Sequence, residues 1–228
     1  KEFELLQLRY EELMRKAKIA AGKTLLYREP PHYITLGKEL PAKALDEILT
    51  DHAEVFTELK EYYKQTSESE TTKISFYEDT YSLYNLYRFS HYYEEAYGKY
   101  IWLKSGASLV IEHTEAMTVI DVNTGSVLKK KKQEDTLFYQ INREAAKEIA
   151  RQLRLRNISG IIMIDFINMK DTAQKEKLLS LLDSECKKDR VHCNVIDMTA
   201  LNLVEMTRSK VRKPLHEQIR SCMKNNRS

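Results

Sequence analysis

Apolar and polar residues follow two different periods along the chain, and the changes between them predict a series of helices and strands. From residue 3 to residue 21 apolar side chains recur at helical spacing, and Gly22 marks the expected end of that helix. Apolar runs typical of buried strands occupy residues 118–122 and 160–166. Between them, residues 135–157 carry apolar positions at helical spacing. The pattern therefore predicts a strand–helix–strand unit in the second half of the chain.

Weaker patterns predict the remaining elements. We expect helices at residues 42–49, 51–63 and 171–188, and strands at residues 25–27, 33–35, 73–77, 101–103, 108–112 and 191–196. Residues 65–72 are polar and predict a loop, and a basic segment closes the chain at residues 207–220. These elements predict an α/β protein with an open sheet, divided into two subdomains.

The tyrosine-rich segment at residues 81–100 allows two interpretations. Its rings could stack on nucleobases, because every base offers a π-face. Their mixed helical spacing also suits a helix that packs on a sheet, and we favour this packing interpretation. The residues concerned are Tyr84, Tyr87, Phe89, Tyr92, Tyr93 and Tyr97.

The composition is that of a globular protein without a membrane span. Of the 228 residues, 42% are hydrophobic and 31% are charged, and no apolar run approaches the ~18–20 residues that a span requires. The net charge of +3 does not by itself argue for a nucleic-acid partner.

The cysteines, Cys186, Cys193 and Cys222, are odd in number and form no close pair, so we expect a reducing, cytoplasmic location. Because the chain begins at Lys1 inside a helical pattern, we expect it to be part of a longer protein.

Each of the two central strand runs delivers an aspartate, Asp121 and Asp165. Burying an ionised carboxylate is costly unless a cation or donors compensate it. In α/β proteins ligands bind outside the carboxyl ends of the strands, and Mg²⁺ takes one or two carboxylates as hard oxygen ligands. We predict that Asp121 and Asp165 hold a divalent cation between them. Since the six histidines are scattered, a catalytic zinc site is not expected.

Asn123, two residues after Asp121, also has two interpretations. Its amide could fix an Asp carboxylate or donate to a phosphate oxygen, or it could stabilise the Thr124-Gly125 turn. Asn168, three residues beyond Asp165, could likewise be a turn residue.

Three basic segments flank the two aspartates in sequence. A run of lysines such as residues 129–132 by itself indicates solvated surface, but a polyanionic ligand would need several such segments to neutralise it. The candidate RNA contacts are Lys129, Lys130, Arg151, Arg154, Arg156, Arg208 and Lys210.

At these residues the sequence resembles the ribonuclease E/G family of bacterial endoribonucleases. The matching blocks are TEAMTVIDVNTG at 114–125, NREAAKEIARQLRLR at 142–156, IMIDFINM at 162–169 and LVEMTR at 203–208. The resemblance implies a connecting helix at 1–22, a partial ribonuclease H-like subdomain at 23–100, a deoxyribonuclease I-like catalytic subdomain at 101–221 and a tail at 222–228. The oligonucleotide-binding-fold domain and most of the 5′-sensor domain would be missing.

The resemblance also implies an activity: cleavage of single-stranded RNA in RNA processing and mRNA decay, with Mg²⁺, for which Mn²⁺ could substitute, and with 5′-phosphate products. Asp121 and Asp165 would be the metal ligands, and Asn123 would orient a ligand or the phosphate. The chain departs from the family pattern at Asn168, where an acid is common, at Asn202, where a Gly is usual, and at Cys222, which lacks a partner thiol. We therefore expect no zinc-linked dimer, while another homo-oligomer of the full-length protein stays open.

Two other functions compete with this prediction. The chain could be an RNA-binding or assembly module that keeps the fold without useful turnover. It could also be a metal-dependent deoxyribonuclease, which should cut single-stranded DNA as readily as RNA.

Overall fold

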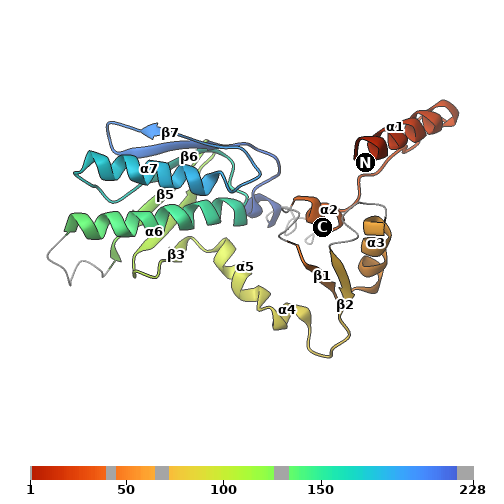
Figure 1. Cartoon of the computed structure of the whole chain (residues 1–228), viewed down its shortest axis with the longest axis horizontal. Helices are drawn as coiled ribbons and strands as arrows, with labels where there is room; N and C mark the ends of the chain where they lie inside the picture. The colour runs from red at the N-terminus through yellow and green to blue at the C-terminus, as the bar shows by residue number, and fades with distance from the viewer. Residues whose placement is uncertain (1, 40–44, 65–71, 126–133, 220–228) are drawn as a thin grey trace. The chain divides into compact units, whose positions relative to one another are not determined.

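The computed structural model describes residues 2–39, 45–64, 72–125 and 134–219, which form two compact units, Lys1–Tyr87 and Arg88–Ser228 (Figure 1). The second unit holds both predicted metal ligands.

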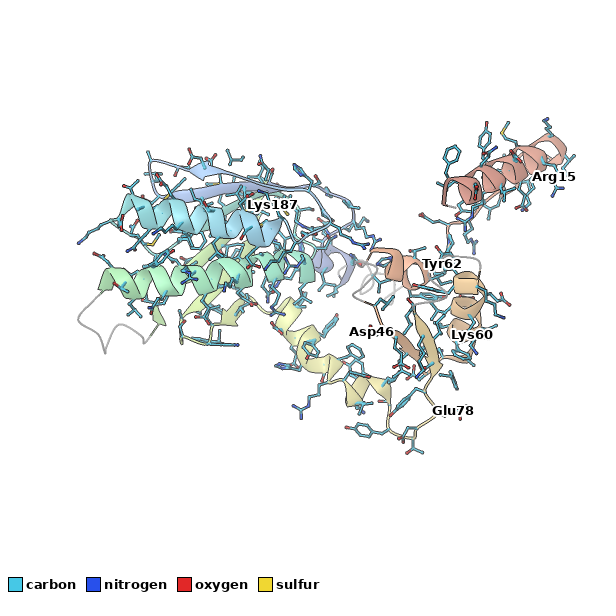
Figure 2. The ribbon with its side chains drawn as sticks, in the orientation of Figure 1. Arg15, Asp46, Lys60, Tyr62, Glu78 and Lys187 are labelled. Carbon is cyan, nitrogen blue, oxygen red and sulfur yellow. The ribbon has the colours of Figure 1, made fainter. Side chains whose placement is uncertain are left out.

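The first unit contains a small parallel sheet covered by a helix. Its elements are α1 (Glu2–Ile19), α2 (His32–Glu39), β1 (Glu47–Thr50), α3 (Ala53–Lys64), β2 (Lys73–Phe76) and α4 (Leu83–Leu86). Strands β1 and β2 pair in parallel, and Ile34, Leu59 and Tyr63 form the buried core. Helix α3 carries Lys60 and Tyr62 (Figure 2). The Lys60 ammonium lies 4.3 Å from the centre of the Phe56 ring.

The sequence prediction for this unit is partly confirmed. Helices α1 and α3 and strand β2 form where expected, but the strand expected at 33–35 is wrong because those residues belong to α2. Two prolines precede α2, and proline suits the first turn of a helix. The helix expected at 42–49 is wrong in its described part, because residues 47–50 pair with β2. No strand forms at 25–27, and the expected loop lies outside the described residues except for Thr72.

The second unit is a six-stranded mixed sheet with its strands in the order β3-β4-β5-β6-β8-β7. Only β5 and β6 run parallel, and α6 connects them. The elements are α5 (Phe89–Tyr97), β3 (Tyr100–Trp102), β4 (Ser108–His113), β5 (Met117–Asn123), α6 (Glu134–Leu155), β6 (Gly160–Asp165), α7 (Thr172–Cys186), β7 (Cys193–Met198) and β8 (Leu203–Arg208).

Helices α6 and α7 lie side by side over one face of this sheet (Figure 1). The core between them contains Ile120 of β5, Ile164 of β6 and Val204 of β8 from the sheet, and Ile149 and Leu178 from the helices. Alternate residues of the strands point to the opposite face, where Ile161 of β6 is 49% exposed and Ile196 of β7 is 54% exposed. The sheet therefore has one helix-covered face and one open face.

The strands and helices expected in this half are confirmed, with one addition and one correction. Strand β8 was not expected: residues 203–208 had been noted only as a family block, and the last two of them also as the start of the closing basic segment. It pairs antiparallel with both β6 and β7. The packing expected for the aromatic segment is wrong: Tyr84, Tyr87, Phe89, Tyr92, Tyr93 and Tyr97 are 48–53% exposed. The residue that α5 buries is the small Ala96.

Candidate active site

Strand pairing brings the two predicted metal ligands together. In the parallel ladder of β5 and β6, Asp121 is the direct partner of Asp165. Directly paired residues of neighbouring strands lie about 5 Å apart, and their side chains point to the same face. For this pair it is the open face, because Ile120, Val122 and Ile164 beside them are buried against the helices. Two carboxylates that are distant in sequence thus lie next to each other on the open face of the sheet.

The electrostatics of Asp165 agree with this proximity. The pKa of its carboxyl is raised, chiefly by partial burial and further by the negative charge of Asp121. Both effects oppose ionisation of Asp165. A bound cation would relieve them.

Asn123 is attached to this pair directly. Its side-chain Nδ2 donates a hydrogen bond of 2.7 Å to Oδ2 of Asp121. Residues i and i+2 of a strand lie on one face, so the spacing observed in the sequence allows this contact. The bond restricts rotation of the Asp121 carboxylate, as expected if Asn123 orients a ligand.

The turn after Asn123 is built on a close backbone approach. Gly125 has a φ of +55°, and a Cβ at this position would lie 2.8 Å from the carbonyl oxygen of Gly106. Any larger residue would be strained there and would displace the β3–β4 turn. Glycine at position 125 therefore keeps the end of β5 against that turn.

A groove of about 820 Å³ extends from the aspartates over the open face of the sheet. Apolar residues of β5 and β6 form much of its wall, including Met117, Val119, Ile161 and Met163. Glu205 of β8, which sequence reasoning had noted only as part of a motif, also lines it. It pairs with Met163, which lies two residues before Asp165 on β6.

The oxygen-rich pair fits a magnesium ion better than a softer metal. Mg²⁺ binds through one or two carboxylates and keeps water and substrate phosphate oxygens as its other ligands. Across the described ranges, no group of three or more His, Cys, Asp and Glu residues is arranged to hold a metal ion. Asp121 and Asp165 could hold such an ion, with several positions left for water and phosphate.

The arginines among the predicted RNA contacts lie away from the aspartates. Strand β8 and helix α6 both end at the end of the sheet where β6 begins, at Gly160. This end lies about 16 Å along the strand from Asp165. Arg208, which is 4% exposed, donates to Asp189, to the Asn157 side chain and to the Ile158 carbonyl.

The arginines of α6 and its end also have internal partners. Arg151 forms ion pairs with Glu95 and Glu148, and Arg154 donates to the Glu185 carbonyl. Arg156 donates to Gln152 and to the Glu95 carbonyl, and burial lowers the pKa of its guanidinium to about 10. Lys210 is exposed, and Lys129 and Lys130 lie outside the described residues.

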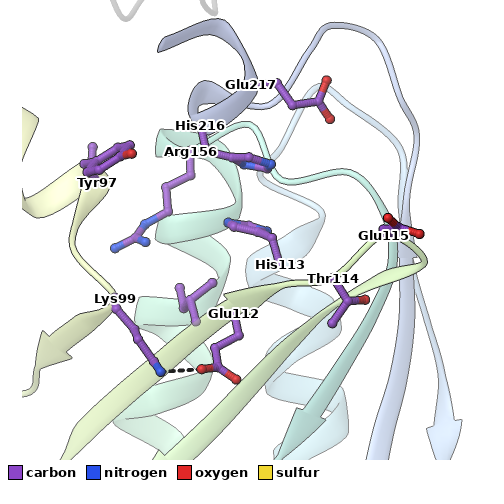
Figure 3. Close-up of a pocket in the computed structure, with 11 residues that line it drawn as sticks. Tyr97, Lys99, Glu112, His113, Thr114, Glu115, Arg156, His216 and Glu217 are labelled. Carbon is purple, nitrogen blue, oxygen red and sulfur yellow. Dashed lines mark ion pairs between the residues drawn. The ribbon is translucent and has the colours of Figure 1, made fainter. Parts of the chain in front are cut away.

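A second pocket, of about 760 Å³, occupies this other end of the unit (Figure 3). The rings of His113 and His216, remote in sequence, stack there with centroids 4.1 Å apart. Lys99 forms an ion pair with Glu112 across the pocket wall (Figure 3). No pattern in the sequence indicates this histidine pair, because the contact depends on tertiary structure.

No helix in the described ranges is both long and apolar enough to cross a membrane.

Comparison with known proteins agrees with the resemblance. The model of the ribonuclease E/G family matches residues 1–211. The chain is 37% identical over 203 residues to ribonuclease G of Haemophilus influenzae, covering 89% of this chain and 41% of that protein. It is 34% identical to ribonuclease G of Escherichia coli K12 over 206 residues, covering 90% of this chain and 42% of that protein. For ribonuclease E of Nostoc sp. the identity is 31% over 219 residues, covering 95% of this chain and 32% of that protein.

The chain thus spans about two fifths of the length of the ribonuclease G proteins it matches. Since the family model matches most of its residues, including both aspartates and Asn123, the chain belongs to the ribonuclease E/G family.

Proposed function

We propose that this chain carries the catalytic centre of a metal-dependent endoribonuclease that cleaves single-stranded RNA in RNA processing and decay. The observation that carries the proposal is the direct pairing of Asp121 with Asp165 on the open face of the sheet. Two relatives named ribonuclease G and one named ribonuclease E support an RNA substrate.

In the proposed site Asp121 and Asp165 hold the metal, and Asn123 keeps the Asp121 carboxylate in one orientation. The metal, when bound, would supply Lewis acidity toward a phosphate oxygen and lower the pKa of a coordinated water. Mg²⁺ is the proposed ion and Mn²⁺ its substitute. Attack of water on phosphorus, with departure of the 3′-oxygen, would leave the phosphate on the 5′ end of the downstream product.

The groove beside the aspartates is open along the sheet, which suits an extended strand better than an enclosed small molecule. A phosphate held at the carboxylates would place the neighbouring nucleotides along this groove or beyond it. An RNA contact by Lys129, Lys130, Arg151, Arg154, Arg156, Arg208 or Lys210 stays a prediction. So do the deoxyribonuclease I-like and ribonuclease H-like subdomains, a homo-oligomer and the lack of a zinc link.

The test is cleavage of a short, 5′-labelled single-stranded RNA with Mg²⁺, compared with Asp121→Asn and Asp165→Asn variants. We expect either variant to lower the cleavage rate by at least about 10²-fold while the far-ultraviolet circular dichroism stays unchanged. Single-stranded DNA of the same sequence should be cut much more slowly, and the downstream RNA product should be a ligase substrate because it carries a 5′-phosphate.

Two results would favour the competing functions. Binding of RNA without cleavage in either Mg²⁺ or Mn²⁺ would indicate a binding module. Equal cleavage rates on single-stranded DNA and RNA would indicate a metal-dependent deoxyribonuclease.

A further inference from the structure

Helix α6 contacts the backbone on both sides of the aspartate pair through two polar side chains, Asn142 and Glu144. The sequence pattern does not distinguish them from the other residues of the predicted helix at 135–157. Their contacts point to a role beyond helix formation.

Asn142 is fully buried, at 0% exposure, on the face of α6 that packs against the sheet. Its neighbours on that helix, Ile141, Ala145 and Ala146, are apolar core residues. Nδ2 of Asn142 donates a hydrogen bond of 2.7 Å to the Ile167 carbonyl, and Oδ1 accepts one of 3.0 Å from the Ile167 N–H. One side-chain amide therefore satisfies both polar groups of a single peptide residue.

The location of Ile167 explains why such a partner is needed. The ladders of β6 end at Asp165, which pairs with Asp121 on one side and Leu203 on the other. Two residues later the chain has no strand neighbour, and buried backbone groups without partners are costly. Asn142 takes the place of a neighbouring strand and fixes the chain just beyond Asp165.

Glu144 acts similarly on the other side. Its two carboxylate oxygens accept hydrogen bonds from the backbone N–H groups of Lys104, at 2.7 Å, and Ser105, at 3.3 Å. These residues form the β3–β4 turn, which reaches Gly125 through the Gly106 carbonyl. Gly125 ends the turn that follows Asn123, so the position of Asn123 depends on a turn that Glu144 holds.

We propose that Asn142 and Glu144 are positioning residues that fix the separation and orientation of Asp121, Asn123 and Asp165. This inference rests on the proposed function. Metal ligands must be held within about 0.5 Å of a productive geometry, and partners that orient ligands typically change metal affinity or activity by about 10–100-fold. A purely apolar residue at position 142 would fill the core but release the chain after Asp165.

The test compares Asn142→Leu with Gln152→Leu in the full chain. Gln152 is a matched control because it is also 0% exposed, lies on α6 and donates to Glu95 and Glu148. It is ten residues further along the helix, about 15 Å toward its other end.

We expect Asn142→Leu to lower kcat for RNA cleavage by about 10–100-fold and to weaken Mn²⁺ binding, measured by electron paramagnetic resonance, by about tenfold. The KM for RNA should stay within about twofold, because the RNA-contacting surface is unchanged. Gln152→Leu should leave kcat and Mn²⁺ binding unchanged even where its melting temperature falls as far.

Two substitutions of Glu144 should lower kcat to different degrees. Glu144→Ala removes both acceptors, whereas Glu144→Gln keeps one, so the loss of kcat should be larger for alanine. If Asn142→Leu does not fold, Asn142→Ser decides the matter, because its hydroxyl can keep one contact with Ile167 and should retain intermediate Mn²⁺ affinity.

The proposal is overturned if folded Asn142→Leu, or Asn142→Ser in its place, keeps wild-type kcat and Mn²⁺ affinity. It is also overturned if Gln152→Leu loses both in proportion to stability, because the effect would then be structural. Failure of the proposed function looks different: the wild-type chain would not cleave RNA, and Asp165→Asn would not change Mn²⁺ binding.

Discussion

At the scale of single residues, Asp165 shows how this site differs from an ordinary surface carboxylate. Its pKa is raised by partial burial and by Asp121, so its ionised form is less favourable in the folded protein than in the unfolded chain. A residue that costs stability in this way is expected where function requires it.

We therefore predict that Asp165→Asn stabilises the metal-free protein slightly, by up to about 1 kcal/mol at neutral pH, while abolishing cleavage. The free energy of unfolding from urea titration checks this. Adding Mn²⁺ should raise the melting temperature of the wild-type chain but not of the variant. A variant less stable than the metal-free wild type would contradict the argument.

The same raised pKa sets the direction of a pH dependence. Because the folded-state pKa lies above the ordinary value of 3.8, the folded state binds more protons across the interval between the two values. The Asp165 contribution to stability is most favourable below that interval and is lost as pH rises through it. Without metal, the difference in unfolding free energy between wild type and Asp165→Asn should grow with rising pH, then level off. Mn²⁺ affinity should fall as pH drops through the same interval.

Asn123 offers a second test at this scale. Asn123→Ala removes the 2.7 Å hydrogen bond to Asp121 and should lower kcat by about 10–100-fold. Asn123→Asp places a third carboxylate beside the pair, and repulsion between like charges should make its Mn²⁺ binding depend more steeply on pH. If Asn123 only stabilises the following turn, both variants will lower the melting temperature and leave kcat unchanged.

At the scale of elements, Arg208 anchors the end of β8. The guanidinium and the Asp189 carboxylate form a buried ion pair, and the remaining Arg208 donors bind Asn157 and Ile158. Removing one partner of a buried pair leaves the other charge without compensation.

Arg208→Ala should therefore destabilise the chain by about 3–5 kcal/mol, measured by urea unfolding. Lys210→Ala, on the exposed surface just beyond β8, should change stability by less than about 0.5 kcal/mol. If Arg208 instead contacts RNA, its substitution will reduce the salt dependence of RNA binding and leave the unfolding free energy almost unchanged.

Elements with a strong local pattern were also the ones the sequence predicted well. The strands that carry the aspartates and the helix between them are recognisable from period alone, because each buries a face of its own residues. Strand β8 and strand β1 were not, since their pairing partners lie elsewhere in the chain. The tyrosines of α5 show the converse: helical spacing does not tell whether a neighbouring surface is present to cover them.

At the scale of the whole molecule, the carboxylate oxygens of Asp121 and Asp165 suit a hard metal ion. We expect a zinc-selective chelator to leave RNA cleavage unchanged and ethylenediaminetetraacetate to stop it, with recovery on adding excess Mg²⁺ or Mn²⁺. Quantified metal content of the purified protein is the control. Loss of cleavage with the zinc-selective chelator would show that a softer metal takes part.

The amino-acid sequence by itself determined which positions carry the aspartates, that each follows an apolar strand run, and that Asn123 shares a face with Asp121. These properties follow from the two-residue period of a strand, which is local. Only the tertiary structure decided that Asp121 and Asp165 are direct partners, which face of the sheet stays open, and that Asn142 and Glu144 reach the chain on either side of the site. Those outcomes depend on the register between strands and on packing between residues far apart in the chain, and no local pattern encodes them.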